Sequence, residues 1–183
     1  MDLSWIAKRK TVQNDIEVKE KTIIILSLLD TAIKTVRRIA TDLRPSILDD
    51  LGLIAAIEWQ SEEFERRSGI STEFISTMAE FRYSSGIAIG LFRICQESLT
   101  NVARHAEASK ICISLQEHDN ENILLKIEDN GRGFEVRKIG DKKTLGLLGM
   151  RERTLMMGGE FRIKSDPGKG TTLFVTVPLT IAD

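Results

Sequence analysis

The stretch ILLKIEDNGRGF, residues 123–134, changes from an alternating apolar pattern to an acid, an amide and two glycines. The alternation predicts a strand that ends near Asp129. A carboxylate accepts hydrogen bonds and cannot donate them, so Asp129 suits an exocyclic amino group such as that of adenine. The following glycines would let a flat ring approach the backbone. An ordinary Asn-Gly hairpin turn is the alternative, and the pentapeptide DNGRG alone favours that turn.

A second group of polar residues lies in QESLTNVARHA, residues 96–106. Glu97 and Asn101 are four positions apart, so on a helix they share a face and can present oxygens to a hard cation such as Mg²⁺. Arg104 or His105, one turn further along, could then meet phosphate. The alternative is a polar helix edge whose basic residues interact favourably with the helix dipole. Taken alone, this pattern favours the alternative.

Two glycine-containing segments follow, GLLGM at residues 146–150 and DPGKG at residues 166–170. Gly146 and Gly149 open a predicted helix whose free N–H groups suit an anion. A Walker-type phosphate loop is excluded, because Lys169 is followed by Gly170 where that motif needs serine or threonine. The alternative for DPGKG is an ordinary hairpin turn, and both roles are compatible.

The elements that must position these residues follow from periodicity and from glycine and proline positions. Their order argues against a doubly wound parallel sheet and predicts an α+β fold. We expect two layers, a mixed and mostly antiparallel sheet with helices on one face. A short connector is predicted at residues 46–50. Helices are predicted at 51–69, 84–106 and 146–159, and strands at 70–76, 110–116, 122–128, 160–165 and 171–179.

The first part of the chain predicts a helix with a heptad seam, which ends before Pro45. The seam residues are spaced four and three apart and leave an apolar stripe for a partner helix: Ile25, Leu29, Ala32, Val36, Ile39 and Leu43.

Bulk composition limits the function classes. The chain is 42% apolar and 29% charged, and its formal net charge of −1 gives no overall attraction to nucleic acid or anionic membrane. No segment predicts a signal peptide or a membrane span. Cys95 and Cys112 lack metal-ligand spacing, so both are predicted to be buried, reduced thiols.

The motifs in this fixed order resemble the ATPase domain of sensor histidine kinases, of the Bergerat-fold superfamily. The upstream segment TVRRIATDLRPSILDDLGLIAAIEWQ is similar to the end of the dimerisation region and the linker of the nitrate/nitrite-sensor subfamily. The resemblance implies a Bergerat-type two-layer sandwich at residues 49–183, which binds ATP. It implies a partial helical dimerisation hairpin and linker at residues 1–48.

The resemblance also implies site residues. Asp129 would bind the adenine amino group, with Gly131 and Gly133 shaping that pocket and Thr171 closing it. Asn101 would coordinate Mg²⁺, and Glu97 would support the metal or a water, so that both are the candidate catalytic residues. Phosphate and lid contacts would come from the remaining candidates: Arg104, His105, Gly146, Leu147, Gly149 and Met150. The charged loop at residues 135–145 would be the lid.

The activity implied is transfer of the γ-phosphoryl group of ATP to a histidine. The intact protein would be a homodimer that acts on a response regulator, with these residues in the cytoplasm and a membrane anchor elsewhere left open. No nucleic-acid partner and no membrane contact are expected for these residues. No histidine precedes His105, and His118-Asp119 lies in a predicted turn, so the acceptor histidine is expected outside this chain. The alternatives are a serine-directed protein kinase or ATPase of the same superfamily, or an ATP-gated interaction module without turnover.

Overall fold

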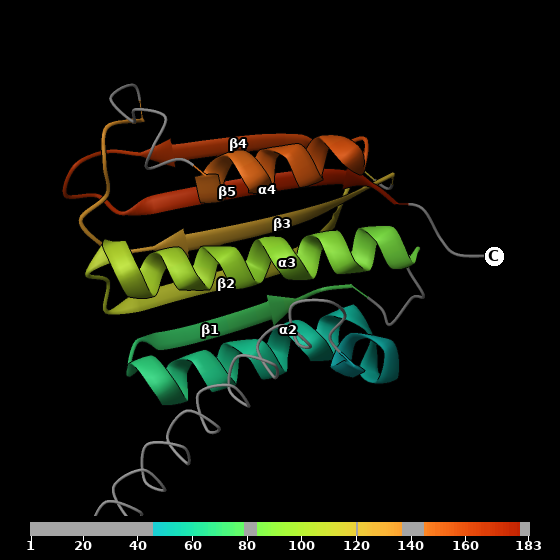
Figure 1. The fold of residues 1–183 in the computed structure, drawn as a ribbon, viewed down its shortest axis with the longest axis horizontal. Coiled ribbons are helices and arrows are strands. Elements are labelled where there is room, and N and C mark those ends of the chain that lie inside the picture. The colour runs from blue at the N-terminus through green and yellow to red at the C-terminus, as the bar shows by residue number, and fades with distance from the viewer. Residues whose placement is uncertain (1–45, 79–83, 120, 137–144, 180–183) are drawn as a thin grey trace, which may run out of the picture. The chain divides into compact units, whose positions relative to one another are not determined.

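The computed structural model describes residues 46–78, 84–119, 121–136 and 145–179, which form one compact unit that begins at Ser46. The predicted heptad helix and most of the predicted lid loop fall outside these ranges, and nothing in the structure tests the predicted domain division at residue 48. They therefore stay predictions. The described elements follow the order α2, β1, α3, η1, β2, β3, α4, β4, β5, as Figure 1 shows for the labelled helices and strands.

The strands form one five-stranded sheet in the order β1-β2-β3-β5-β4. Strand β1 pairs with β2 in parallel, and the other three pairings are antiparallel. The predicted mixed, mostly antiparallel sheet is confirmed. The strand bounds are β1 Ser71–Ser76, β2 Lys110–His118, β3 Asn122–Asp129, β4 Glu160–Ser165 and β5 Thr171–Pro178.

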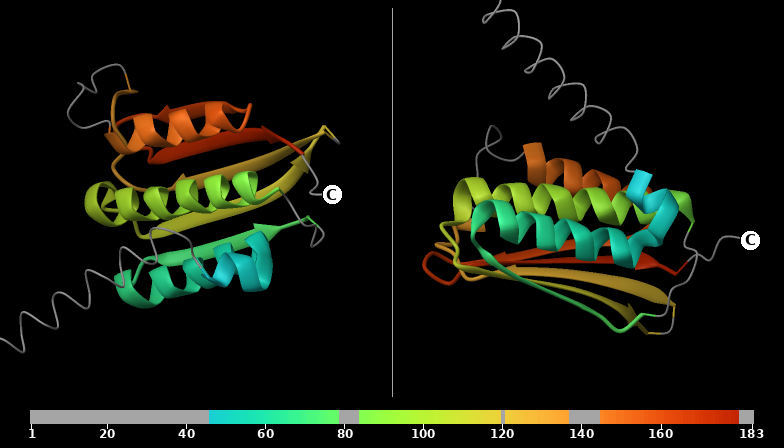
Figure 2. Two further views of the ribbon diagram at one scale, coloured as in Figure 1. Left: turned by 45° about the vertical axis from the view of Figure 1, so that its right-hand side comes forward. Right: turned by 90° about the horizontal axis from the view of Figure 1, so that it is seen from below.

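All the described α-helices cover the same face of this sheet, as the right-hand view of Figure 2 shows. They are α2 (Ser46–Ser68), α3 (Ser85–Asn101) and α4 (Leu145–Met156). Helix α3 continues into a π-helical turn, η1 (Val102–Ala106). The predicted α+β two-layer sandwich is confirmed.

One boundary prediction was wrong. Residues 46–50, predicted as a connector, belong to α2 and are separated from its main part by a kink at Gly52. The φ of +81° at Gly52 is outside the helical region, and only glycine adopts it readily. The sequence LGL therefore marks a change of direction inside the helical segment and not its first turn.

The core lies between the helices and one face of the sheet. Alternate residues of the central strands are buried there, among them Ile113 and Leu125, which are fully buried. The opposite face carries the intervening residues and is covered by none of the described helices. Because the side-chain period of a strand is two, the register decides which functional residues face the helices.

The two cysteines lie in different layers: Cys95 is on helix α3, and Cys112 is on the helix-free face of the sheet. Cys95 on α3 is buried as predicted, and burial raises the pKa of its thiol to about 12, so it is an unreactive core residue. Cys112 on β2 was predicted to be buried but is only half-buried, because it pairs with Glu128 on the helix-free face.

Candidate functional site

Asp129 is the last residue of β3 and faces the helix layer. It lies between Ile111 of β2 and Thr171 of β5, and only 8% of it is exposed. The N–H of Gly131 donates to its Oδ1 at 2.8 Å, and Thr171 lies beside it on the neighbouring strand. Burial nevertheless raises the pKa of Asp129 above its usual value, with the hydrogen bond from Gly131 acting in the opposite direction.

Thr171 links Asp129 to a serine that the sequence reasoning missed. Ser165 is the last residue of β4 and pairs with Thr171, whose Oγ1 lies 3.0 Å from the Ser165 Oγ. The same Ser165 oxygen accepts the N–H of Phe134 at 2.9 Å and lies 3.0 Å from the Gly170 carbonyl oxygen. The alternating pattern of the strand predicts only which face of β4 carries Ser165. The serine belongs to none of the recognised motifs.

The loop after Asp129 is held between two parts of the molecule. The N–H of Arg132 donates to the Ala106 carbonyl at 2.7 Å, and the N–H of Gly168 donates to the Arg132 carbonyl at 2.6 Å. The loop therefore joins the end of η1 to the β4–β5 turn. Asn130 also joins the loop to the start of β2, because its Oδ1 accepts hydrogen bonds from the N–H groups of Ser109 and Lys110 at 3.0 and 2.9 Å.

Gly131 is required by this close approach. A Cβ at this position would collide with the carbonyl oxygen of Ala106 and lie 2.8 Å from the Asp129 Oδ1. Gly133 has a different reason, since its φ of +57° is in the left-handed region and a Cβ there would collide with the Asp166 carbonyl. The two glycines of DNGRG thus serve the packing of the loop as well as any ligand.

Glu97 and Asn101 lie one turn apart near the end of α3, and both are half-buried. The first turn of α4 approaches them: a Cβ added to Gly146 would collide with the Glu97 Oε1 and lie 3.4 Å from the Asn101 Nδ2. Within the described residues, neither side chain forms a hydrogen bond or an ion pair with another protein group. A carboxylate and an amide at this spacing fit Mg²⁺, which usually takes one or two protein ligands plus phosphates and water.

The remaining candidates divide into exposed and buried side chains. Arg104 and His105 are exposed on η1, directly beyond Asn101. Leu147 and Gly149 are half-buried on α4. Met150 is only 1% exposed and is a core side chain, with its sulfur 3.4 Å from the Ser98 hydroxyl. Its contact with a nucleotide stays a prediction.

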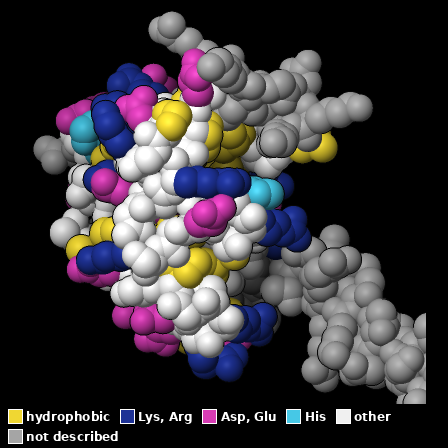
Figure 3. All heavy atoms as spheres, turned by 90° about the vertical axis from the view of Figure 1, so that its left-hand side faces the viewer, with side chains coloured by type: hydrophobic (Ala, Val, Ile, Leu, Met, Phe, Trp, Pro, Cys, Tyr) yellow, Lys and Arg dark blue, Asp and Glu magenta, His cyan; other side chains and the backbone are white. Residues whose placement is uncertain are grey.

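The structure gathers most candidates at one end of the molecule, where α3, β3 and β4 end and where α4 and β5 begin (Figure 1). Figure 3 faces this end and shows basic, acidic and histidine side chains close together on it. No cluster of three or more His, Cys, Asp or Glu side chains that could hold a metal occurs in the described ranges. None of the helices described there is long and apolar enough to cross a membrane.

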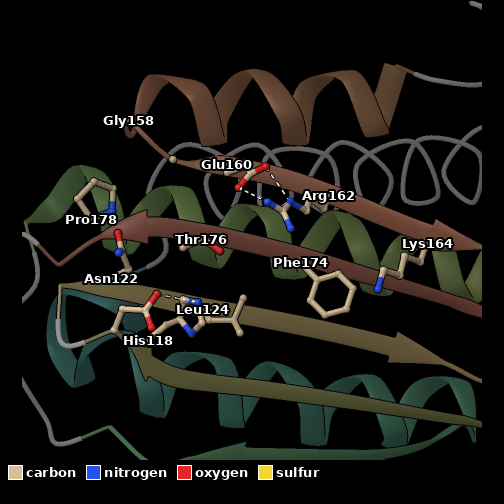
Figure 4. A pocket seen from close by; sticks show the side chains of 12 residues that line it. His118, Asn122, Leu124, Gly158, Glu160, Arg162, Lys164, Phe174, Thr176 and Pro178 are labelled. Carbon is tan, nitrogen blue, oxygen red and sulfur yellow. Dashed lines mark hydrogen bonds and ion pairs between the residues drawn. The ribbon is translucent and has the colours of Figure 1, made fainter.

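A pocket on the helix-free face does not contain these candidates. It lies towards the other end of the sheet, and Figure 4 shows its lining side chains on β3, β4 and β5. Its charges are largely paired internally, as in the bond from Arg162 Nε to Glu160 Oε1 at 2.7 Å and the His118–Asp119 contact at 3.1 Å. We therefore locate the candidate site at the Asp129 end, where the buried carboxylate lies.

Comparison with known proteins bears on this site. The family described as "Histidine kinase-, DNA gyrase B-, and HSP90-like ATPase" matches residues 86–181, just over half of the chain, and these residues contain every candidate side chain. The chain belongs to this ATPase family. The predicted resemblance to the ATPase domain of sensor histidine kinases is thereby confirmed.

Similar curated proteins are sensor kinases. DegS of Brevibacillus brevis, a signal transduction histidine-protein kinase/phosphatase, is 36% identical over 155 residues, which are 84% of this chain and 39% of that protein. The oxygen sensor histidine kinase NreB of Staphylococcus carnosus is 33% identical over 171 residues, which are 93% of this chain and 49% of that protein. This ATPase-family chain thus spans less than half the length of either relative.

Solved structures support the fold. The Acinetobacter baumannii histidine kinase AdeS matches with a TM-score of 0.60 at 18% identity, over 85% of this chain and 84% of that one. The histidine kinase domain of the Erythrobacter litoralis EL346 blue-light activated kinase matches with a TM-score of 0.57 at 21% identity, over 69% and 61% of the two chains.

The close packing around Gly131 predicts that adding a single methyl group there destabilises the fold. Gly131→Ala should lower the free energy of unfolding by about 1–3 kcal/mol, because backbone atoms of Ala106 would have to move. Gly86→Ala is the matched control: it lies in the first turn of α3 with nothing near its Cβ position and should stabilise by about 0.4–1 kcal/mol. Urea unfolding measures both, and equal effects would show that Gly131 is not needed for packing.

The raised pKa of Asp129 predicts how pH changes stability. A carboxyl whose pKa is higher in the folded state than in the unfolded state favours folding when protonated, and this advantage is lost as pH rises through the folded pKa. The difference in unfolding free energy, wild type minus Asp129→Asn, should therefore fall as pH rises from about 4 towards neutrality. Urea unfolding at several pH values measures it. A difference that stays constant or grows would contradict the burial argument.

Proposed function

We propose that this chain contains the ATP-binding catalytic domain of a sensor histidine kinase, which transfers the γ-phosphoryl group of ATP to a histidine outside residues 1–183. The observation that carries the proposal is the buried Asp129 carboxylate, which faces the helix layer at the same end of the molecule as Glu97 and Asn101. One nucleotide could therefore contact Asp129 through its adenine and, through a bound metal ion, Glu97 and Asn101.

Adenine recognition follows from the hydrogen-bonding capacity of Asp129. An ionised carboxylate offers about four acceptor positions. Gly131 supplies one donor at 2.8 Å, so that acceptor capacity is left over for a ligand. The 6-amino group of adenine is a donor that can occupy it, whereas a carbonyl at the same ring position would meet an acceptor.

The triphosphate would extend from Asp129 towards the end of α3 and η1. Asn101 and Glu97 would hold Mg²⁺, which, when bound, neutralises charge on the phosphate oxygens. Arg104 and His105 are exposed there and would contact phosphate, and Gly146 would lie close because its missing side chain leaves room beside Glu97. Gly133, Leu147, Gly149, Met150 and the loop at residues 135–145 complete the proposed nucleotide-binding set.

Catalysis on this reading is mainly positioning and charge neutralisation, as is general for phosphoryl transfer. Neither histidine of the chain fits the acceptor role. His105 belongs to the proposed phosphate-binding end. His118 ends β2 seven residues beyond Ile111, the partner of Asp129, which places it roughly 23 Å along the strand from that position.

The proposal extends to the intact protein. Residues 1–48 would form part of a helical dimerisation segment and linker, the kinase would act as a cytoplasmic homodimer, and its product would be passed to a response regulator. The similarity to DegS and NreB, both named as histidine kinases, supports a histidine kinase over a serine-directed kinase.

ATP binding tests the adenine assignment. Asp129→Asn should weaken ATP binding roughly tenfold to a hundredfold, equivalent to about 1.5–3 kcal/mol for a lost hydrogen bond to a charged acceptor. Asp166→Asn, an exposed carboxyl in the β4–β5 turn, is the matched control and should leave the affinity unchanged. Calorimetry with a non-hydrolysable ATP analogue and Mg²⁺ measures both. Unchanged affinity in a folded Asp129→Asn protein would refute the assignment.

Phosphoryl transfer tests the kinase assignment. Radiolabelled ATP should leave no acid-labile label on this chain alone. A longer form of the protein that carries the upstream residues, inactivated by Asp129→Asn, should become labelled when this chain is added, slowly because transfer between separate molecules lacks the effective concentration of an intact dimer. Asn101→Ala in the added chain should abolish labelling.

Three outcomes would contradict this. Phosphate release without labelling would indicate an ATPase, and binding with neither release nor labelling would indicate an ATP-gated module. Label on this chain that disappears in His118→Ala would show that His118 is an acceptor.

A further inference from the structure

The helix-free face of the sheet carries a pocket that lies apart from the proposed nucleotide site. Its volume is about 650 Å³, within the range of ligand sites, and it lies over β3, β4 and β5. Figure 4 shows Lys164 and Phe174 towards one end of the pocket and Pro178 and Asn122 towards the other. Antiparallel strands commonly leave one face to water, and polar side chains then line that face. The pocket departs from that pattern.

The floor of the pocket is largely apolar. Leu124 of β3 and Phe174 of β5 are half-buried there, although no described helix covers this face. Side chains two positions apart on a strand share a face, so Phe174, Thr176 and Pro178 follow one another along β5. Leu124 pairs with Thr176 and widens this strip onto β3. The strip can accept apolar side chains of a ligand.

The charged groups around this floor are paired, with one exception. Arg162 donates two hydrogen bonds to Glu160, from Nε to Oε1 at 2.7 Å and from Nη2 to Oε2 at 2.9 Å. The histidine at the end of β2 contacts the aspartate that follows it, at 3.1 Å. Lys164 forms no ion pair with any residue that the structure describes, and its Nζ lies 5.4 Å from the centroid of the Phe174 ring. The Phe174 end of the pocket therefore carries a positive charge without a carboxylate partner.

Neutral polar groups and the length of the pocket restrict the ligand further. The side chains of Asn122 and Thr176 form no hydrogen bond with another described residue, so an amide and a hydroxyl are available. Lys164 pairs with Thr172, six positions before Pro178, so the pocket extends roughly 20 Å along β5. An extended chain of about six residues covers this length. A single ring or a free amino acid would occupy only part of it.

We infer that this pocket is a docking site for an extended peptide segment of a partner protein, with an acidic side chain followed two positions later by an apolar one. The acidic side chain binds Lys164, and the apolar one packs on Phe174 and Leu124. The amide of Asn122 and the hydroxyl of Thr176 bind backbone groups of the peptide. Selecting alternate side chains is a general way of recognising an extended peptide.

Labelled peptides titrated with the full chain test this inference. The probe is a fluorescein-labelled hexapeptide with aspartate, leucine and valine at its odd positions and threonine at its even positions. Two comparison peptides carry asparagine or lysine in place of the aspartate. Fluorescence anisotropy should show that the aspartate peptide binds most tightly and the lysine peptide least. The preference should shrink at about 0.5 M NaCl, because salt screens exposed charges.

Variants of Lys164 test the charge contact. Lys164→Gln should weaken binding of the aspartate peptide about twofold to fivefold, the range of an exposed ion pair, and leave the asparagine peptide unaffected. Lys164→Glu should reverse the preference, so that the lysine peptide binds more tightly than the aspartate peptide. Lys110→Gln is the matched control and should change none of the affinities. Lys110 is an exposed lysine on the same face, paired with Glu73 at 2.9 Å and outside the pocket.

Amide chemical shifts in NMR spectra locate the bound peptide. The aspartate peptide should shift the amide signals of Leu124, Phe174 and Thr176 more than those of Gly131. A saturating non-hydrolysable ATP analogue with Mg²⁺ should not displace the peptide, because Asp129 faces the opposite side of the sheet. Urea unfolding establishes that each variant is folded at the temperature of the binding measurement.

Several outcomes would overturn the inference and leave the proposed function untouched. Equal affinities for the three peptides, no binding up to about 1 mM peptide, or an unchanged preference in Lys164→Glu would show that Lys164 does not select an acidic segment. Displacement of the hexapeptide by an equal concentration of phenylacetate would indicate a site for small carboxylates. Self-association of the chain that Lys164→Glu abolishes would show that a second copy occupies this face.

Discussion

A carboxylate at the edge of an apolar core must be supplied with hydrogen-bond donors, and this requirement organises the candidate site. Asp129 is nearly buried where β3 leaves the sheet, and burial disfavours its charged form. A donor comes from the turn that follows it, the N–H of Gly131, and strand β5 places Thr171 beside it. The bond from Gly131 ties the loop to the end of the strand.

The sheet register makes this arrangement possible. Because β3 pairs with β5 and β5 with β4, Asp129 of β3 lies in one row with Thr171 and Ser165 of a hairpin that is more distant in sequence. A shift of one residue in either pairing would turn a member of this row to the helix-free face. The buried apolar residues of the same strands therefore stabilise the geometry of the polar row, since they determine which register is favourable.

Helix packing brings the second half of the site close. Helix α3 carries Glu97 and Asn101, and α4 begins beside them only because Gly146 has no side chain. The other end of this helix pair is equally tight: a Cβ on Gly90 of α3 would collide with the Met157 sulfur. Close contact at both ends of the pair fixes the start of α4 against the end of α3. The pocket on the helix-free face takes no part in this arrangement.

Local sequence patterns determined the elements and their types. Alternation and turn residues predicted the strands, and the spacing of Glu97 and Asn101 placed both on one helix face, because helix and strand periods are local properties. The order of the motifs also determined the family resemblance. The kink at Gly52 was missed because leucine and glycine in that position are compatible with a first helical turn.

Tertiary structure alone decided which of these elements meet. The proximity of Gly146 to Glu97, the contact of Gly131 with the end of η1 and the pairing of Thr171 with Asp129 all join residues 25 or more positions apart. Strand order β1-β2-β3-β5-β4 and helix packing set these contacts, and neither is encoded in the period of a single segment. Serine at the end of a strand has no pattern of its own, so Ser165 became visible only through its partners.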